Sequence, residues 1–145
     1  MGKAVLNHLR RALGIGFPCG AAAFLVLHQG ALLLLHRWAK VTPVAPWSFA
    51  PMGPMEAPAV IWLTIWAGLY GIAIALLLRL LRVPELAAGL VLGLLATLAA
   101  PYIHAPGGLP LFGTGTPGPL WLSLLLNGLF GWGAVFFMRP FALRG

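Results

Sequence analysis

The polar residues inside the apolar segments are the ones whose chemistry needs a reason. His28 and Gln29 stand side by side within "FLVLHQGALLLLHRW", residues 24–38. In hydrocarbon an unpaired polar group costs several kcal/mol, so both side chains must face protein or water. Neighbouring residues of a helix point about 100 degrees apart, so the pair can face polar residues of other segments. The candidates for such contacts are Asn127, Thr64, Thr97 and Ser123.

Two interpretations of this polar pair stay open. In the first, His28 and Gln29 form an interhelical hydrogen-bond clasp that contributes about 0.6 to 2 kcal/mol and fixes the register of the helices. In the second, they form a polar intramembrane site with Asn127 and Thr64, as a constriction or a substrate contact on a permeation path. The residue types and their spacing are compatible with both.

A second set of candidate ligands is expected toward the outer face of the membrane. His36 and His104 are predicted to share a depth there, and Met52 and Met55 lie in the loop beside them. Imidazole and thioether ligands suit copper in an oxidising compartment, although the spacing matches no tight metal motif. Haem would need two histidines at similar depth on opposing helices, and His28 has no such partner in this chain. The sequence therefore assigns no cofactor.

Residue patterns typical of enzymes are missing from the sequence. It contains no nucleophile triad, no paired carboxylates and no glycine-rich phosphate loop after a strand. The segment "GTGTPG" at 113–118 resembles such a loop only in composition. Glu56 and Glu85 each stand just before an apolar segment, where a carboxylate favours the positive end of a helix dipole. We therefore expect no enzyme activity.

The composition places this chain in a lipid bilayer. Hydrophobic side chains make up 61% of its 145 residues and charged ones only 8%, against about a quarter charged in soluble domains. A helix needs about 20 apolar residues to cross about 30 Å of hydrocarbon. The pattern predicts a single membrane domain with four spans, preceded by an amphipathic helix over 3–13 at the inner interface. The predicted spans cover about 14–36, 59–78, 85–103 and 119–138.

The basic residues stand at the ends of the predicted spans. One side receives Lys3, Arg10, Arg11, Arg79, Arg82, Arg139 and Arg144, and the other receives Arg37 and Lys40. By the positive-inside rule both termini are cytoplasmic, and the loops 38–58 and 104–118 face outward. Because these residues do not gather on one face of a folded domain, nucleic acid is not an expected partner.

An internal repeat is visible in the second and fourth predicted spans. The segment "WAGLYGIAIALLLR", residues 66–79, aligns without gaps on "LNGLFGWGAVFFMR", residues 126–139. The preceding spans align more weakly, with His36 opposite His104. Both halves run from inside to outside and back, so they would be parallel repeats about an axis along the membrane normal. The expected fold is all-α, a membrane four-helix bundle built from two repeated helical hairpins.

Small residues recur at helical spacing in every predicted span. Helices in lipid have little hydrophobic drive to associate, so their close approach relies on small side chains. A seam that the bundle leaves unfilled could pair two copies of the chain. The glycines expected to pack helices together are Gly68, Gly71, Gly89, Gly93, Gly128 and Gly131.

Three motifs of the first half carry a resemblance to other proteins. They are "HQG" in the first span, the loop "PVAPWSFAPMGPMEAP" and "WAGLYG", a WxGLxG pattern, in the second span. Together, over roughly the first 80 residues, they resemble small multi-pass membrane proteins of bacteria for which no activity is established. The resemblance implies a bacterial inner membrane as the location.

The function expected from the sequence is that of a non-enzymatic inner-membrane protein that acts through helix packing. Its partners would be the lipid bilayer and either further copies of itself or other subunits of a larger membrane complex. One alternative is a small channel or carrier with a polar site at His28, Gln29 and Asn127. The other alternative is copper or haem handling at the outer face.

Overall fold

The structure is a computed structural model that describes residues 2–53, 55–80, 83–99 and 119–141. A long first helix runs without a break from Gly2 to Arg37. Its consecutive segments are α1 (Gly2–Arg11), η1 (Ala12–Gly16), α2 (Phe17–Ala22), η2 (Ala23–His28) and α3 (Gln29–Arg37). Both η1 and η2 have the wider turn of a π-helix.

The other elements are a small β-hairpin and shorter helices. The strands β1 (Pro51–Met52) and β2 (Ala57–Pro58) pair antiparallel within the loop between α3 and α4. The helices that follow in the described residues are α4 (Ala59–Leu80), α5 (Glu85–Ala99) and α6 (Leu120–Met138), and α6 ends in the 3-10 turn η3 (Arg139–Phe141).

A proline accounts for the first π-helical segment. Pro18 has no N–H to donate, and its ring would crowd the carbonyl group of Gly14 in a regular α-helix. A local widening of the turn is one way in which a membrane helix accommodates proline. The backbone at Arg11 stays helical, with φ −65° and ψ −43°, so α1 continues directly into η1. The predicted amphipathic helix over 3–13 is therefore the beginning of the long first helix, and its position at the membrane interface stays a prediction.

Three helices are long and apolar enough to cross a membrane. They cover Val5–Arg37, Ala59–Arg79 and Leu120–Phe141. The mainly helical fold predicted from the sequence is thus confirmed, and these three helices are compatible with the predicted membrane protein. The predicted span 85–103 corresponds to the shorter apolar helix Glu85–Leu98, and residues 100–103 lie outside the described residues. A fourth crossing stays a prediction.

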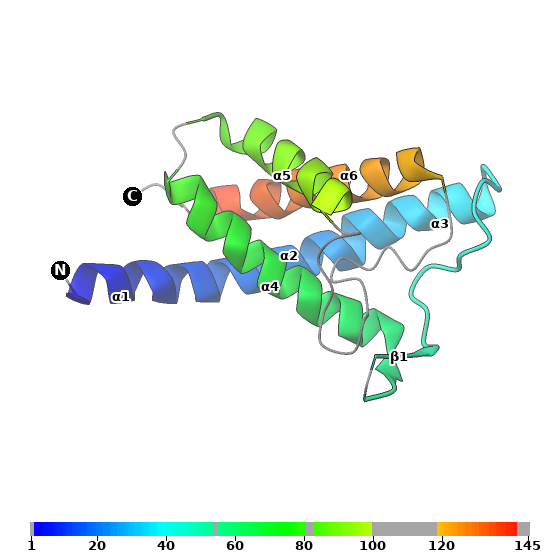
Figure 1. The fold of residues 1–145 in the computed structure, drawn as a ribbon, viewed down its shortest axis with the longest axis horizontal. Helices are drawn as coiled ribbons and strands as arrows, with labels where there is room; N and C mark the ends of the chain where they lie inside the picture. The colour runs from blue at the N-terminus through cyan, green and yellow to red at the C-terminus, as the bar shows by residue number, and fades with distance from the viewer. Residues whose placement is uncertain (1, 54, 81–82, 100–118, 142–145) are drawn as a thin grey trace.

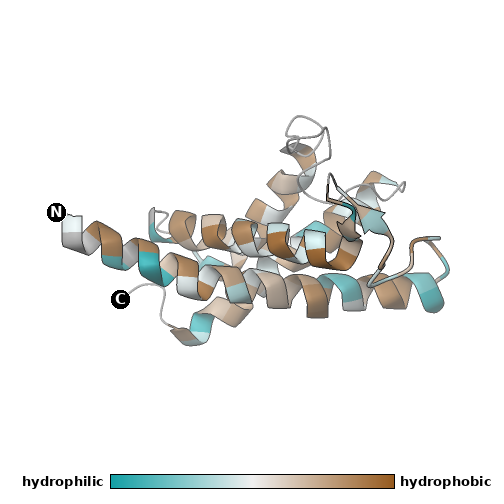
Figure 2. Ribbon diagram, turned by 90° about the horizontal axis from the view of Figure 1, so that it is seen from below, coloured by the Kyte–Doolittle hydropathy of each residue, from teal (hydrophilic) through white to brown (hydrophobic). Residues whose placement is uncertain are grey.

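The helices run back and forth along one direction. In Figure 1, α1 begins and α6 ends at the same end of the structure, and α4 ends and α5 begins there too. Figure 2 shows that hydrophobic residues cover most of the length of the helices, while many hydrophilic ones lie toward the helix ends. This arrangement is typical of a chain whose helices lie side by side in a bilayer.

Glycines bring the first helix and α4 together backbone to backbone. A Cβ atom added to Gly71 of α4 would collide with the carbonyl oxygen of Gly16, and it would lie 2.8 Å from the Cα of Gly20. One turn away, a Cβ at Gly68 would lie 2.5 Å from the ring of Phe17. Side chains larger than hydrogen at these positions would push the two helices apart.

The same kind of contact joins α5 and α6. A Cβ at Gly131 would collide with the carbonyl oxygen of Gly89, and one at Gly93 would collide with the carbonyl oxygen of Asn127. Gly128 has more room, because a Cβ there would lie 3.2 Å from leucine side chains of α5. All six glycines that the sequence analysis names therefore lie at contacts between helices.

The interior is filled toward the end at which α6 finishes. Ile74 and Leu78 of α4 and Val135 and Met138 of α6 are at most 1% exposed. Toward the other end α4 diverges from α3, and the loop with the β-hairpin lies between them (Figure 1). This divergence leaves space under the loop, and the candidate site lies there.

Candidate ligand-binding cavity

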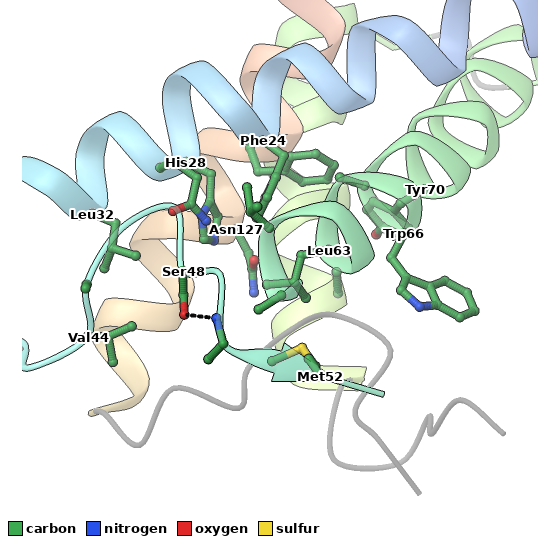
Figure 3. Close-up of a pocket in the computed structure, with 18 of the residues that line it drawn as sticks. Phe24, His28, Leu32, Val44, Ser48, Met52, Leu63, Trp66, Tyr70 and Asn127 are labelled. Atoms are coloured by element: carbon green, nitrogen blue, oxygen red, sulfur yellow. Dashed lines mark hydrogen bonds between the residues drawn. The ribbon is translucent and has the colours of Figure 1, made fainter. Parts of the chain in front are cut away.

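A cavity of about 200 Å³ lies between the first helix, α4 and α6, beneath the loop that carries the β-hairpin. Its wall is mostly apolar and includes the aromatic rings of Phe24, Trp66, Tyr70 and Phe130. The polar residues in the wall are His28, Gln29, Ser48, Tyr70 and Asn127. Figure 3 shows His28 and Asn127 approaching this space from two different helices, with Met52 of the loop on the opposite side.

His28 is the last residue of η2, and its imidazole has no hydrogen bond within the part of the chain that the structure describes. Its Nδ1 atom is buried and lacks a partner. The imidazole ring lies 5.0 Å from the ring of Phe24, at an interplanar angle of 34°. A buried polar group without a partner costs about 1 to 3 kcal/mol, and in native proteins it usually finds a water or a ligand. The imidazole is therefore the unexplained polar group of the site.

Gln29, by contrast, binds the loop. Its Oε1 atom accepts a hydrogen bond of 2.8 Å from the backbone N–H of Trp47. The indole Nε1–H of Trp47 donates to the carbonyl oxygen of Leu25 at 3.2 Å. That carbonyl is free to accept because the π-helical turn directs the Gln29 N–H to the carbonyl of Phe24. We call these two bonds the Trp47 clasp.

Trp47 is held in an uncommon backbone conformation. Its φ is 49°, in the left-handed region that few residues other than glycine adopt. Lys40 and Glu56, in the same loop, also have positive φ values, 52° and 50°. Such conformations persist where surrounding contacts fix them. For Trp47, the two hydrogen bonds of the Trp47 clasp supply such contacts, and they keep the loop over the cavity.

Asn127 links α6 to α5 rather than to the first helix. Its Nδ2 donates to the Oγ1 of Thr97 at 2.9 Å, and the Thr97 hydroxyl donates to the carbonyl of Ser123 at 3.3 Å. Asn127 still contributes to the cavity wall. Thr64 takes no part in this cluster, because its hydroxyl donates to the carbonyl of Val60 in its own helix at 2.6 Å.

Of the predicted polar site, the structure thus brings His28, Gln29 and Asn127 to one cavity and leaves Thr64 outside the wall. It adds Tyr70, whose hydroxyl donates to the carbonyl of Leu92 at 2.7 Å. Tyr70 was not among the predicted site residues. One signal in the sequence pointed to it, namely its alignment with Phe130 in the internal repeat. The two rings lie 5.8 Å apart beside the cavity.

The predicted metal ligands do not form a cluster within the described residues. His36 Nδ1 lies 2.9 Å from the carbonyl oxygen of Thr42. Met52 lines the cavity, whereas the side chain of Met55 is 72% exposed. His104 lies outside the described residues, within which no group of three or more histidine, cysteine or acidic residues is placed to hold a metal. Copper or haem handling stays a prediction.

The wall chemistry suits a small neutral molecule. Within the described residues the wall contains no lysine, arginine, aspartate or glutamate, so a charged ligand would lose its hydration without a counter-charge. No protein family model matches the chain, and comparison with curated proteins and with solved structures gives no match. Function must therefore be inferred from the cavity itself.

Proposed function

We propose that this chain is a multi-pass membrane protein, without enzyme activity of its own, that holds a small, neutral, mainly apolar molecule under its loop, as a binding protein or carrier does. The observation that supports this most is the imidazole of His28, which lines a cavity of about 200 Å³ without a hydrogen bond in the described residues. Ionisable residues inside membrane spans are rare and usually mark functional sites, so the unpaired imidazole supports a functional role for His28.

The alternative explanation, a packing role for all the polar residues, accounts for only part of the site. Gln29 binds the loop and Asn127 binds Thr97, so packing explains both side chains. His28 joins no helix to another by a hydrogen bond, and an apolar residue would pack against Phe24 at a lower cost. Its presence is therefore better explained by a ligand than by stability.

For the orientation we propose that both termini are cytoplasmic in a bacterial inner membrane and that α5 is the fourth, shorter crossing. Arg10, Arg11, Arg79 and Arg139 lie on the elements that meet at one end of the structure. The bilayer side that carries more basic residues in short loops is the cytoplasmic side. The cavity and its loop then face the outer half of the membrane.

Binding of 4-fluorotoluene to the full chain in lipid nanodiscs, followed by fluorine NMR, tests the proposed function. We expect saturable binding that nanodiscs without protein lack. Leu63→Trp adds a large ring to the cavity wall and should abolish this binding. Leu77→Trp makes the same change at an exposed position of the same helix and should preserve it. Equal binding by the two variants, or no saturable binding by the wild type, would contradict the proposal.

A second candidate function, assembly through helix packing, is favoured by two other glycines of the first helix. A Cβ at Gly14 or at Gly30 would meet no atom within 4 Å, whereas Gly16 and Gly20 are in close contact with α4. A glycine surface left open within one chain allows a second helix to approach closely. We propose that the helix surface around Gly30 joins copies of the chain or another subunit of a complex.

The oligomeric mass of the Gly30→Leu variant tests the assembly proposal. If copies meet at Gly30, this substitution should convert the assembly to monomers in light scattering from mild detergent. Val91→Leu, at an exposed position of α5, serves as the control and should leave the mass unchanged. A wild-type chain that is already monomeric, or an assembly that Gly30→Leu leaves intact, would rule out self-association at this surface.

A further inference from the structure

Resting on the proposed function, we infer that the ligand is a compact aromatic molecule with one hydroxyl or carbonyl oxygen. Its ring lies among the aromatic side chains of the cavity, and its oxygen pairs with the imidazole of His28. The cavity volume, the ring contacts of the wall and the hydrogen-bonding capacity of His28 each support one part of this inference.

The volume limits the size of the ligand. An engineered apolar cavity of about 150 Å³ binds benzene, which has six non-hydrogen atoms. By proportion, the cavity of about 200 Å³ in this chain holds roughly eight such atoms. Drug-sized ligands occupy pockets of about 300 Å³ or more. The space therefore fits one six-membered ring with one or two small substituents.

The wall favours an aromatic ring over an aliphatic chain of equal size. Tyr70 and Phe130 lie with their ring centroids 5.8 Å apart, and Phe24 packs against the ring of His28. Aromatic rings gain about 0.5 to 1.5 kcal/mol from offset or edge contacts beyond the effect of buried area. Met52 adds a thioether to the wall, and sulfur also makes favourable contacts with rings. A ligand ring can continue this series of contacts.

The oxygen atom of the ligand is inferred from the hydrogen-bonding capacity of the His28 imidazole. A neutral histidine offers one N–H donor and one nitrogen acceptor, and neither has a partner within the described residues. A phenolic hydroxyl can donate to the acceptor nitrogen or accept from the N–H, and a carbonyl oxygen can accept. Carboxylates and amines are excluded in their charged forms, because the described wall has no opposite charge.

A matched pair of probes tests this inference. 4-Fluorophenol and 4-fluorotoluene have the same number of non-hydrogen atoms and differ only in a hydroxyl or methyl group. After correction for partition into lipid, we expect the wild-type chain in nanodiscs to bind 4-fluorophenol about tenfold more tightly, as one hydrogen bond to a buried group gives. His28→Leu should remove the preference and retain weak binding of both probes, and His28→Gln should restore part of it.

His36→Leu is the matched control, since His36 lies on the same helix but not in the cavity wall; it should keep the preference. His28→Leu leaves no partner group unpaired, so it should fold, and His28→Phe tests the same point with a planar side chain. Equal binding of both probes by the wild type, or a preference that survives in His28→Leu and His28→Phe, would overturn this inference while the proposed function stands. No saturable binding of either probe would overturn both.

Discussion

At the scale of single residues, the adjacent polar pair His28 and Gln29 divides between two roles. Gln29 accepts a hydrogen bond from the backbone of Trp47 and so holds the loop, while His28 lines the cavity without a hydrogen bond in the described residues. The π-helical turn of η2 ends at His28 and leaves the carbonyl of Leu25 free for Trp47. Single π-helical turns occur frequently at functional sites, which agrees with the proposed role of the cavity.

The Trp47 clasp gives a prediction about the loop. Gln29→Met keeps the length of the side chain and removes the acceptor oxygen, so the N–H of Trp47 would be left unpaired. We expect the stability to fall by about 1 to 3 kcal/mol and the amide of Trp47 to lose its protection in hydrogen exchange. Ser48→Ala, which removes a local bond to Ala50 in the same loop, is the control. Unchanged protection of Trp47 in Gln29→Met would show that the clasp does not hold the loop.

Gly93 gives a prediction about helix packing. A Cβ at this position meets the carbonyl oxygen of Asn127, a backbone atom that cannot turn aside. Gly93→Ala should therefore destabilise the chain by about 1 to 3 kcal/mol in reversible unfolding by SDS titration. Val91→Ala changes an exposed position of the same helix, so its stability should change little, because no packed contact is lost. Similar losses in the two variants would contradict the packing described for α5 and α6.

The sequence identifies the polar residues of the site but not all their partners. His28, Gln29 and Asn127 are conspicuous because they interrupt apolar runs, and all three line the cavity. The partner of Gln29 could not be found in this way, because Trp47 reaches it only through the fold of the loop and the irregular turn of η2. Thr64 was assigned to the same site, but threonine in a helix can satisfy its own hydroxyl four residues back, as it does here with Val60.

At the scale of the elements, prolines and apolar runs locate the helices well. The spans predicted at 59–78 and 119–138 correspond to α4 (Ala59–Leu80) and α6 (Leu120–Met138). Each helix begins directly after a proline, Pro58 or Pro119, and proline is favoured at helix starts and disfavoured inside them. The β-hairpin was not foreseen, because its strands have only two residues each and contain Pro51 and Pro58.

The repeat predicted from the sequence stays a prediction, and the glycine contacts suggest a different register for its weaker part. Gly16 and Gly20 meet Gly71 as Gly89 and Gly93 meet Gly131. The alignment that places His36 opposite His104 would instead place Gly16 opposite Pro84. A weak alignment of apolar spans is easily shifted, since leucine and alanine recur at many spacings, whereas close backbone contacts tolerate only glycine.

The contact between α5 and α6 gives a prediction at this scale. The Oγ1 of Thr97 accepts a hydrogen bond from the amide of Asn127 and donates one to the carbonyl of Ser123. Thr97→Val should therefore lower the stability by about 0.6 to 2 kcal/mol in SDS unfolding. Combining it with Asn127→Leu in a double-mutant cycle should give a total loss smaller than the sum of the two single losses, because both remove the same bond. Strictly additive losses would show that the two side chains do not interact.

At the scale of the whole molecule, the divergence of α4 from α3 makes room for the cavity and for the loop that covers it. The proposed orientation places both in the outer half of the membrane. The end of the bundle away from the loop is filled by Ile74, Leu78, Val135 and Met138, and the cavity with His28 lies at the end that the loop covers. Among the described residues, Arg10, Arg11, Arg79 and Arg139 lie on the elements that meet at the opposite end, which is the cytoplasmic end in the proposed orientation.

The orientation can be checked by cysteine labelling in intact cells. The single native cysteine, Cys19, is buried, and Cys19→Ala provides the background. In that background Ala45→Cys, at an exposed position of the loop, should react with a membrane-impermeant maleimide added outside. Val83→Cys, exposed between α4 and α5, should react only after the cells are opened. The reverse pattern would invert the topology, and labelling of both positions from outside would mean that the number of crossings is wrong.

The most direct measurement is the crystal structure of the chain grown in a lipid phase with 4-bromophenol, in which bromine is located by its anomalous scattering. We expect a bromine site inside the cavity, with the phenol oxygen within hydrogen-bond distance of the His28 imidazole, and no such site in Leu63→Trp crystals. Bromine found only on the lipid-facing surface at saturating 4-bromophenol, with the cavity filled by protein side chains, would contradict the proposal that this chain holds a small molecule beneath its loop.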